Sequence, residues 1–545
     1  MRPYYSGPVS DETIADSRPP TAAPTPRRRV SINTAIFALA TGISRIAGLA
    51  REIVASAYFA DRPSASAFTI ASQIPNLMSN LFAQAALSAA FVPVFTDLLQ
   101  QGRKREAFKL ASTLFWIILI ALGAITALGI LLAGVIMPLF TGTHFTAADN
   151  ALTAGLAQVL FPVVLLLGLT GLLVGILQSY DEFSVAAIAP AVWNLVILVL
   201  LVGLHSRFKQ PIYAYAVAWL VATVVQLAMV ASALRRIDFR LAFTVDWRDP
   251  RVHQVFVLML PVTIGLGIVN LDQLLNSVFG SLVSSAAPRA IDQAFRIYML
   301  PQGVFSVAVA TVLFPTLSRQ ASRRAPAEMR RSIGNGMRQI NLLLIPSAAI
   351  TMVLATPIVR LLYQHGVFHA ADTHRVSIAL FWFAFSLPFG GVNLLLTRTF
   401  FALKRPWIPT RYAAMNMVVD IIVSLALYKP LGIAGLVIGT AVANAVMTGL
   451  LLRRLTIGFN GRLEGPQTRM ITLRILIASV LMAALARGIW LGIDALLGRS
   501  TVAQVFSVGV AITVAGALYA RIVLAMRIAE ARQIQALVAG RLRRR

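Results

Sequence analysis

Apolar stretches of about 20 residues or more, separated by short polar breaks, follow one another along almost the whole chain. Read as helices, they cover residues 33–58, 65–98, 107–139, 149–179, 184–204, 211–234, 254–283, 288–318, 335–363, 374–402, 408–428, 431–452, 470–493 and 502–525. Roughly 20 apolar residues suffice for one helical crossing of a bilayer. The pattern therefore predicts an all-α polytopic membrane protein with about fourteen transmembrane helices.

Composition supports the same class. The 545 residues are 58% hydrophobic and only 13% charged, with a mean hydropathy of +0.76. Water-soluble domains carry roughly 45–50% apolar and about 25% charged residues. Both departures indicate repeated membrane crossing, and a single large water-soluble core is excluded.

The net charge of +27 has a membrane explanation, because the basic residues gather in alternate short loops. An even number of spans puts both termini on one side, and the basic loops, within 103–109, 235–251, 319–338 and 453–469, then lie on that side as well. We therefore expect cytoplasmic termini and no nucleic-acid partner. Residues 1–30, rich in Pro, Ser, Thr and Ala, are expected to form a disordered cytoplasmic tail, and 528–545 a basic cytoplasmic tail.

An internal repeat divides the chain further. "IPNLMSNLFAQAALSAAFVPVF" matches "LPQGVFSVAVATVLFPTL", with Pro93 and Pro315 separated by 315 − 93 = 222 residues, and "APAVWNLVILV" matches "RYAAMNMVVDI" at the same offset. Transporters are commonly built from such duplicated halves. We expect two pseudo-symmetric six-helix lobes, 31–240 and 250–458, and two extra C-terminal helices within 466–527.

Catalytic chemistry is poorly represented. The chain has no cysteine, and none of its five lysines follows a glycine, so it has no Gly-Lys phosphate-binding loop. We see no nucleophile elbow and no carboxylate pair placed for hydrolysis. The sequence favours a protein that is not an enzyme, has no cofactor, and draws on an ion gradient, the membrane potential or the substrate gradient.

Charged residues inside predicted spans are costly, at roughly 2.5–3.5 kcal/mol each on insertion scales, and so mark candidate function. The first span carries Arg45, Arg51 and Glu52, and the eighth carries Arg296. Guanidinium groups from both lobes would suit a diphosphate. The alternative is that Glu52 neutralises Arg51 while Arg45 extends to the interface.

A second constellation of polar residues lies in the predicted C-terminal lobe. Asp272 and Asn276 are one turn apart on one span, as are Asn416 and Asp420 on another, and Thr440 can add a hydroxyl. These oxygens suit a small cation or a proton relay. The alternative is interhelical hydrogen bonding, worth about 0.6 kcal/mol in membranes.

The segments "SRIAGLARE", "IPNLMSNLFAQAALSAAFVPVF" and "LPQGVFSVAVATVLFPTLS" resemble the MurJ (MviN) family of lipid II flippases, over roughly residues 33–525. That family belongs to a superfamily that also holds multidrug/cation antiporters and O-antigen flippases. The resemblance implies alternating access, with the lipid tail in a groove near the last two helices and the head group in a central cavity.

By position, the family's essential arginines fall on Arg45, Arg51 and Arg296 and its acid on Glu52. Its sodium site falls on the helices that carry Asp272, Asn276, Asn416, Asp420 and Thr440. The sequence departs from the family at three positions. A loop acid is usual at Ser66, an arginine at Ser79 and a glutamate at Gln84.

The resemblance implies a bacterial inner-membrane protein that flips lipid II from the cytoplasmic to the outer leaflet, driven by a Na+ or H+ gradient or by the membrane potential. Its expected partners are lipid II, the membrane and cell-wall synthesis enzymes. The alternatives are export of another polyprenyl-linked glycan and a non-transporting membrane scaffold for cell-wall enzymes.

Overall fold

A computed structural model describes residues 27–82, 85–180, 182, 184–237, 239–461, 463–498, 500–532 and 535. The side chains of residues 27–41, 78–82 and 85–89 and of several residues between 261 and 272 lie outside that description. Most of both predicted tails, together with the side chains of Ser79, Gln84 and Asp272, therefore falls outside the described part of the chain.

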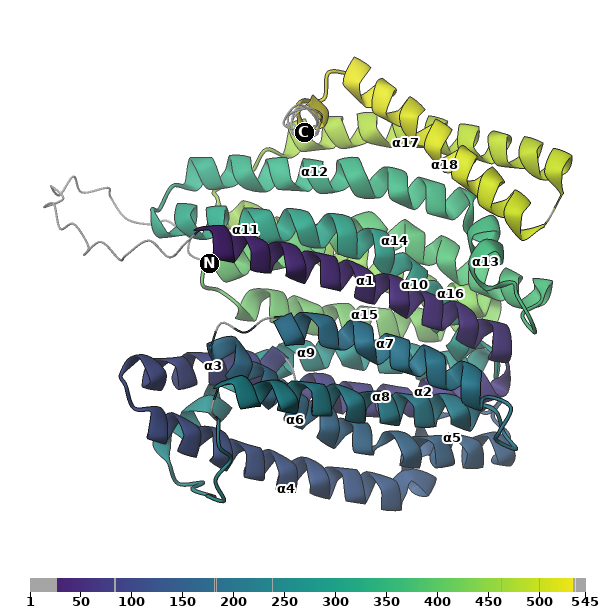
Figure 1. The fold of residues 1–545 in the computed structure, drawn as a ribbon. Coiled ribbons are helices and arrows are strands. Elements are labelled where there is room, and N and C mark those ends of the chain that lie inside the picture. The colour runs from purple at the N-terminus through teal and green to yellow at the C-terminus, as the bar shows by residue number, and fades with distance from the viewer. Residues whose placement is uncertain are drawn as a thin grey trace, which may run out of the picture. The chain divides into compact units, whose positions relative to one another are not determined.

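The chain packs into two compact units. The N-terminal unit, which is the chain up to Arg289 with Gly366–Phe368, contains α1 (Arg27–Phe59), α2 (Pro63–Phe82), α3 (Ala85–Gln100), α4 (Lys104–Ile136), α5 (Ala147–Leu160), α6 (Pro162–Ser179), α7 (Ser184–Leu204), α8 (Ile212–Ala233) and α9 (Pro250–Val283) (Figure 1). Short 3-10 turns, Met137–Phe140 and Leu234–Ile237, extend α4 and α8.

The C-terminal unit begins at Ala290, within α10 (Ala287–Pro301), and also lacks Gly366–Phe368. It continues with the π-helical turn Gln302–Ser306, α11 (Val307–Ser322), α12 (Pro326–Val353), α13 (Ala355–Tyr363), α14 (Ala370–Ala402), α15 (Trp407–Leu431), α16 (Ile433–Gly458), α17 (Gly465–Leu497) and α18 (Thr501–Ala525). Over the described ranges both units are helical, without a β-strand.

Ten helical segments of the described chain are long and apolar enough to cross a membrane, and the bent pair α12–α13 makes an eleventh if counted as one span. Each of the ten coincides with one predicted apolar stretch, and the bent pair covers most of a further one, 335–363. Helices α1, α2, α3 and α9 do not reach that level of length and hydropathy over their described residues. The predicted all-helical membrane fold is confirmed, whereas the exact count of fourteen is not established.

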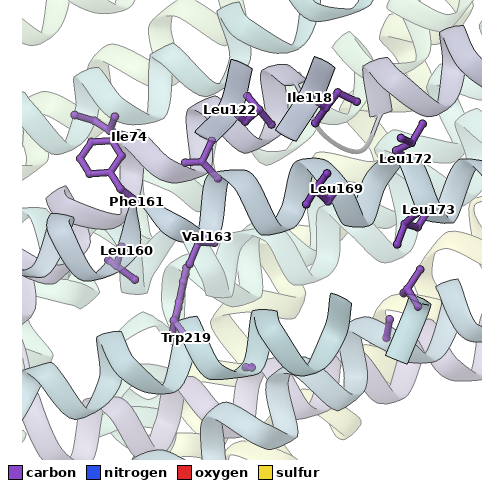
Figure 2. Packing of buried hydrophobic residues seen from close by; sticks show 14 of the residues in the cluster. Ile74, Ile118, Leu122, Leu160, Phe161, Val163, Leu169, Leu172, Leu173 and Trp219 are labelled. Carbon is purple, nitrogen blue, oxygen red and sulfur yellow. The ribbon is translucent and has the colours of Figure 1, made fainter. Parts of the chain in front are cut away.

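The core of the N-terminal unit contains buried side chains from each of the helices α1 to α9. Ile74, Leu122, Phe161 and Trp219 are among its buried side chains (Figure 2). A Cβ at Gly168 would lie 2.2 Å from a methyl carbon of Leu122, so a glycine there lets α6 approach α4 closely.

The C-terminal unit contains a sharp bend of 76° between α12 and α13. Leu354, at the bend, is fully buried in a cluster with Met482 and Trp490 of α17 and Val508 of α18. The hydroxyl of Tyr519 donates a hydrogen bond of 2.7 Å to the carbonyl oxygen of Leu342. The hairpin of α17 and α18 thus packs along the bent pair.

The second segment of the predicted repeat contains a local break, and the first carries Pro75 within α2 and Pro93 within α3. In the second, the π-helical turn Gln302–Ser306 separates α10 from α11. Proline removes a helical hydrogen bond and explains local breaks of this kind.

Candidate functional site

Three charged side chains meet inside the N-terminal unit. Arg51 and Glu52 come from α1, and Arg289 comes from the first turn of α10. Nη2 of Arg289 lies 2.5 Å from Oε1 of Glu52, and Nη2 of Arg51 lies 3.5 Å from Oε2 of Glu52. Each side chain is 5% exposed or less. Two buried guanidinium groups therefore share one buried carboxylate.

Two aromatic rings also pack against the guanidinium of Arg51. Its guanidinium carbon lies 5.1 Å from the ring centre of Trp193 and 5.4 Å from that of Trp219, and these two indoles pack edge to face at 5.0 Å. Cation–π contacts of this kind stabilise a desolvated guanidinium by about 2 kcal/mol. The structure thus shows the arrangement in which Glu52 neutralises Arg51.

Arg289 is not among the site residues that the sequence suggests. Its backbone N–H donates a 3.3 Å hydrogen bond to Oγ of Ser66 on α2, which holds the start of α10 in place. Ser66 is the position at which the resembled family usually has an acid. A pairing between residues 237 positions apart (289 − 52) leaves no local pattern that could have revealed Arg289.

The remaining predicted arginines have different surroundings. Arg45, nearly two turns before Arg51 on α1, is exposed. Arg296 belongs to the C-terminal unit, and its Nε donates a hydrogen bond of 2.9 Å to Asp292 one turn earlier on α10. Its side chain is 36% exposed. Arg296 and Arg45 are therefore accessible in this conformation, whereas Arg51 is not.

Part of the predicted ion site comes together in the C-terminal unit. Asp420 of α15 is 4% exposed and accepts hydrogen bonds from Ser424 at 3.0 Å and from Thr440 of α16 at 3.2 Å. A Cβ at Gly439 would lie 2.7 Å from Oδ1 of Asp420, so this glycine permits the close approach of α16. The carboxylate is thus held by two hydroxyl groups, one of them on the neighbouring helix.

The three other predicted ion ligands are Asn416, Asn276 and Asp272. Asn416, one turn before Asp420, has a buried Nδ2 without a hydrogen-bond partner among the described residues. Asn276 lies on α9 in the N-terminal unit, and the side chain of Asp272 is outside the described residues. The described residues contain no cluster of three or more His, Asp or Glu side chains able to hold a metal ion.

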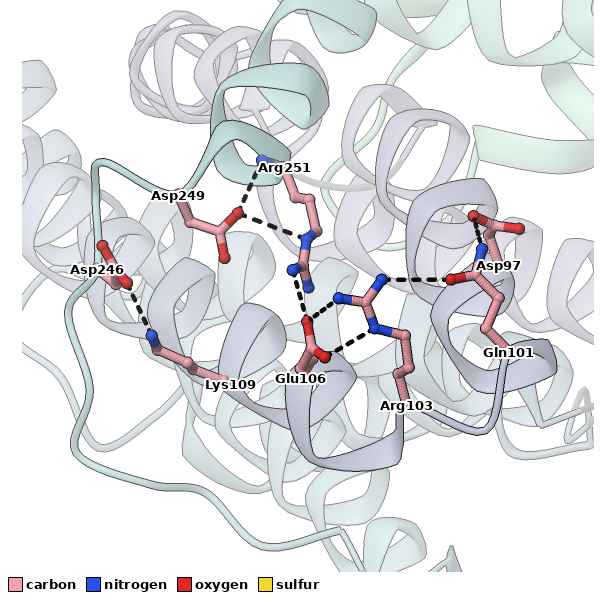
Figure 3. A network of polar contacts seen from close by, with 8 residues as sticks. All are labelled: Asp97, Gln101, Arg103, Glu106, Lys109, Asp246, Asp249 and Arg251. Carbon is pink, nitrogen blue, oxygen red and sulfur yellow. Dashed lines mark hydrogen bonds and ion pairs between the residues drawn. The ribbon is translucent and has the colours of Figure 1, made fainter.

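A polar network ties the loop before α9 to α4 (Figure 3). Glu106 binds Arg103 at 2.7 Å and Arg251 at 2.5 Å, and Lys109 binds Asp246 at 2.8 Å. Backbone groups of Ala242 also bond with Ser112 and Trp116 of α4, each at 3.0 Å. The loop thus lies along α4, held by both charged and neutral hydrogen bonds.

This attachment is expected to weaken in acid. The hydrogen bond and the charge of Lys109 lower the pKa of Asp246 below its ordinary value of 3.8. A depressed carboxyl pKa stabilises the folded state above the ordinary value, and that contribution disappears as pH falls through the lowered pKa. Hydrogen exchange of residues 239–249, corrected for its intrinsic pH dependence, should stay constant near neutrality and accelerate below about pH 4.

The Asp246→Asn variant supplies the control, since it should show fast exchange in this loop at every pH. High salt should accelerate exchange in the unmodified chain, because the pair is solvent-exposed. If hydrogen exchange of this loop in the unmodified chain does not change with pH, the backbone hydrogen bonds alone hold the loop.

The described helices are those of a multi-pass membrane protein. The chain superimposes on a lipid II flippase MurJ in an inward closed conformation with a TM-score of 0.73 at 21% identity, covering 90% of this chain and 100% of that one. It also matches an inward-facing multidrug resistance MATE family transporter with a TM-score of 0.60 at 16% identity, covering 82% and 98% of the two chains. At these identities the likeness defines the fold.

Sequence comparison identifies the family. The model for lipid II flippase MurJ matches residues 55–511. A probable lipid II flippase MurJ from Rhizobium tropici is 32% identical, over 75% of this chain and 78% of that protein, and a lipid II flippase MurJ from Burkholderia cenocepacia is 28% identical, over 76% and 81%. The chain belongs to the lipid II flippase MurJ family. It is accordingly a multi-pass protein of the bacterial inner membrane.

Proposed function

We propose that this chain flips lipid II from the cytoplasmic to the outer leaflet by alternating access. The observation that carries the proposal is the family match over residues 55–511, which spans both units. The buried charges of Arg51, Glu52 and Arg289 support it, because a lipid flippase must accommodate the anionic head group of its substrate inside the bilayer. The substrate would bias the populations of inward-open and outward-open states through contacts that differ between them.

The proposed topology has fourteen spans. The ten apolar segments and the bent pair supply eleven, and α1, the pair α2–α3 and α9 would supply three more. With both termini cytoplasmic, the basic loops would lie inside. The proposed lobes are residues 31–240 and 250–458, followed by a lipid-tail groove at 466–527, with cytoplasmic tails at 1–30 and 528–545.

For the substrate site we propose Arg45, Arg51 and Arg296 as diphosphate contacts, together with Glu52, which would compete with the diphosphate for Arg51. In this conformation Arg51 forms an ion pair with Glu52. A diphosphate can replace a carboxylate at a guanidinium group, since both accept two parallel hydrogen bonds. Arg51 would then pair with Glu52 in the state seen here and with lipid II in another.

Arg51→Ala is expected to reduce lipid II transport by at least tenfold, because one charge-assisted hydrogen bond is worth about 1.5–3 kcal/mol. The test is complementation of a bacterium depleted of its own lipid II flippase, at matched membrane levels. Arg207→Ala, which removes an exposed loop arginine of the same unit, is the matched control and should rescue fully.

The outcomes of the complementation distinguish the three candidate functions. Rescue by the unmodified chain and by Arg207→Ala alone supports lipid II transport through Arg51. Failure of the well-expressed unmodified chain indicates another polyprenyl-linked glycan. Equal rescue by Arg51→Ala removes the diphosphate role and favours a scaffold that recruits cell-wall enzymes.

For energy coupling we propose Na+ or H+ at Asp420, with Asn416, Thr440, Asp272 and Asn276 as further ligands. The buried carboxylate and its hydroxyl partners support this proposal. Hard oxygen ligands suit a small cation, and a buried acid also suits a proton relay.

Asp420→Asn is expected to remove the dependence of transport on the cation gradient, because the neutral amide can neither compensate a cation nor release a proton. Transport would be measured in proteoliposomes with and without imposed Na+ and pH gradients. Ser424→Ala, which removes one hydroxyl partner and leaves the charge, is the control and should keep the dependence. Unchanged gradient dependence in Asp420→Asn would remove the ion site.

A further inference from the structure

A polar cavity lies in the C-terminal unit, apart from the clusters described above. It has a volume of about 130 Å³ and is lined by Arg360, Gln364, Ala370, Thr501 and Gln504, among others. The side chains come from α13, the start of α14 and the start of α18. This is the same region in which the hairpin of α17 and α18 packs along the bend between α12 and α13.

Two buried polar atoms at this cavity lack hydrogen-bond partners within the described residues. Gln504 is 2% exposed, and its Nε2 donates a 2.5 Å hydrogen bond to Asp494, which fixes the orientation of the amide. Its Oε1 is one of the two unpartnered atoms, and Nη1 of Arg360 is the other. Nη1 lies 3.8 Å from Oδ1 of Asp494, too far for a hydrogen bond.

These atoms specify the chemistry of an occupant. The guanidinium of Arg360 can donate a hydrogen bond to an anionic acceptor, and Oε1 of Gln504 can accept one from a donor. Asp494 offsets the charge of Arg360, so a zwitterionic group suits the site better than a bare anion. A cavity of this volume exceeds the roughly 30 Å³ share of one water molecule several times and can hold a phosphate with a short amine.

The surroundings favour a lipid as the source. Leu496 is 84% exposed, Leu497 52% and Val502 80%, at the turn between α17 and α18 next to Thr501. Both helices belong to the segments that can cross a membrane. Apolar side chains beside a polar cavity provide a surface for acyl chains while the head group enters the cavity.

We propose that this cavity binds the phosphoethanolamine head group of a membrane phospholipid, with the phosphate on Arg360 and the ammonium on Gln504. The bound lipid would tie α13 to α18 and so hold the bend between α12 and α13. The inference goes beyond lipid II transport and does not depend on it, because Arg360 and Gln504 are not among the proposed diphosphate or ion ligands and the bound head group is that of another lipid.

The test uses the full chain purified in detergent and delipidated. Native mass spectrometry would compare binding of phosphatidylethanolamine, phosphatidylglycerol and water-soluble glycerophosphoethanolamine. Arg360→Gln should weaken phosphatidylethanolamine binding about tenfold or more, through loss of a charge-assisted bond to the phosphate. Arg474→Gln, which removes an exposed arginine at the other end of α17, should bind like the unmodified chain.

A second variant tests the same site independently, in case Arg360→Gln misfolds. Ala370→Leu narrows the cavity without removing a polar contact, and it should also lose the lipid. Equal binding by the unmodified chain and both cavity variants, or occupation by water alone, would overturn the site. Equal affinity for phosphatidylglycerol would overturn the ammonium contact, and full displacement by glycerophosphoethanolamine at equal concentration would overturn a lipid source.

Discussion

Glu52→Ala should destabilise the folded chain by about 3–5 kcal/mol and remove most folded protein from the membrane. The substitution removes the carboxylate that Arg51 and Arg289 share, while both arginines stay buried. Removing one partner of a buried ion pair is far more costly than never having the pair, because the remaining charge stays desolvated. The measurement is the thermal unfolding midpoint of the detergent-purified protein, together with its yield from membranes.

Two further variants calibrate this effect. Glu52→Gln keeps the shape and an acceptor oxygen, so its loss of stability should be intermediate. Glu328→Ala makes the same change at an exposed position in the first turn of α12 and should shift stability by less than about 1 kcal/mol. A midpoint for Glu52→Ala within that small range would contradict the buried charge cluster.

Arg338→Ala is expected to destabilise the C-terminal unit by about 3 kcal/mol or more. Arg338 of α12 donates a short hydrogen bond to Glu530, which follows α18, and its Nη1 lies 2.9 Å from Glu464, just before α17. Arg338 is 8% exposed and Glu530 3%. One guanidinium therefore joins the α17–α18 hairpin at both of its outer ends to α12. The unfolding midpoint and the proteolytic release of the C-terminal segment would report its loss.

A double variant distinguishes the buried charge from general damage. Arg338→Met with Glu530→Met removes both charges and should be more stable than Arg338→Ala, since no buried carboxylate is left unpaired. Arg331→Ala removes an exposed arginine of the same helix and serves as control. A double variant that is no more stable than the single one would show that packing, and not the ion pair, matters at Arg338.

The positions of the helices could largely be predicted from the sequence, because lipid forces long apolar segments into helices and hydropathy reports this directly. The ten apolar segments of the structure each match a predicted stretch. The bend between α12 and α13 could not be placed from the sequence, since the stretch 335–363 contains both Pro346 and Pro357 and the break depends on how Leu354 packs against the hairpin.

Partners distant in the sequence explain what was missed at the candidate site. Glu52 is predicted beside Arg51 from the sequence, but no local pattern singles out Arg289, Arg338 or Glu530. Asn416 and Asp420 are predicted together from their helix spacing, with Thr440 as a further hydroxyl, and Thr440 does donate a hydrogen bond to Asp420. The convergence of Arg45, Arg51 and Arg296 on one substrate stays a prediction.

The most direct test of the central claim is lipid II translocation by the purified chain in proteoliposomes. Lipid II labelled on its head group would be placed in both leaflets, and its accessibility to an added membrane-impermeant quencher would be followed over time. The account predicts that the unmodified chain makes the inner-leaflet pool accessible within the assay, whereas vesicles with the folded Arg51→Ala variant retain it at least tenfold longer. Equal retention by vesicles with the unmodified chain and by protein-free vesicles would contradict it.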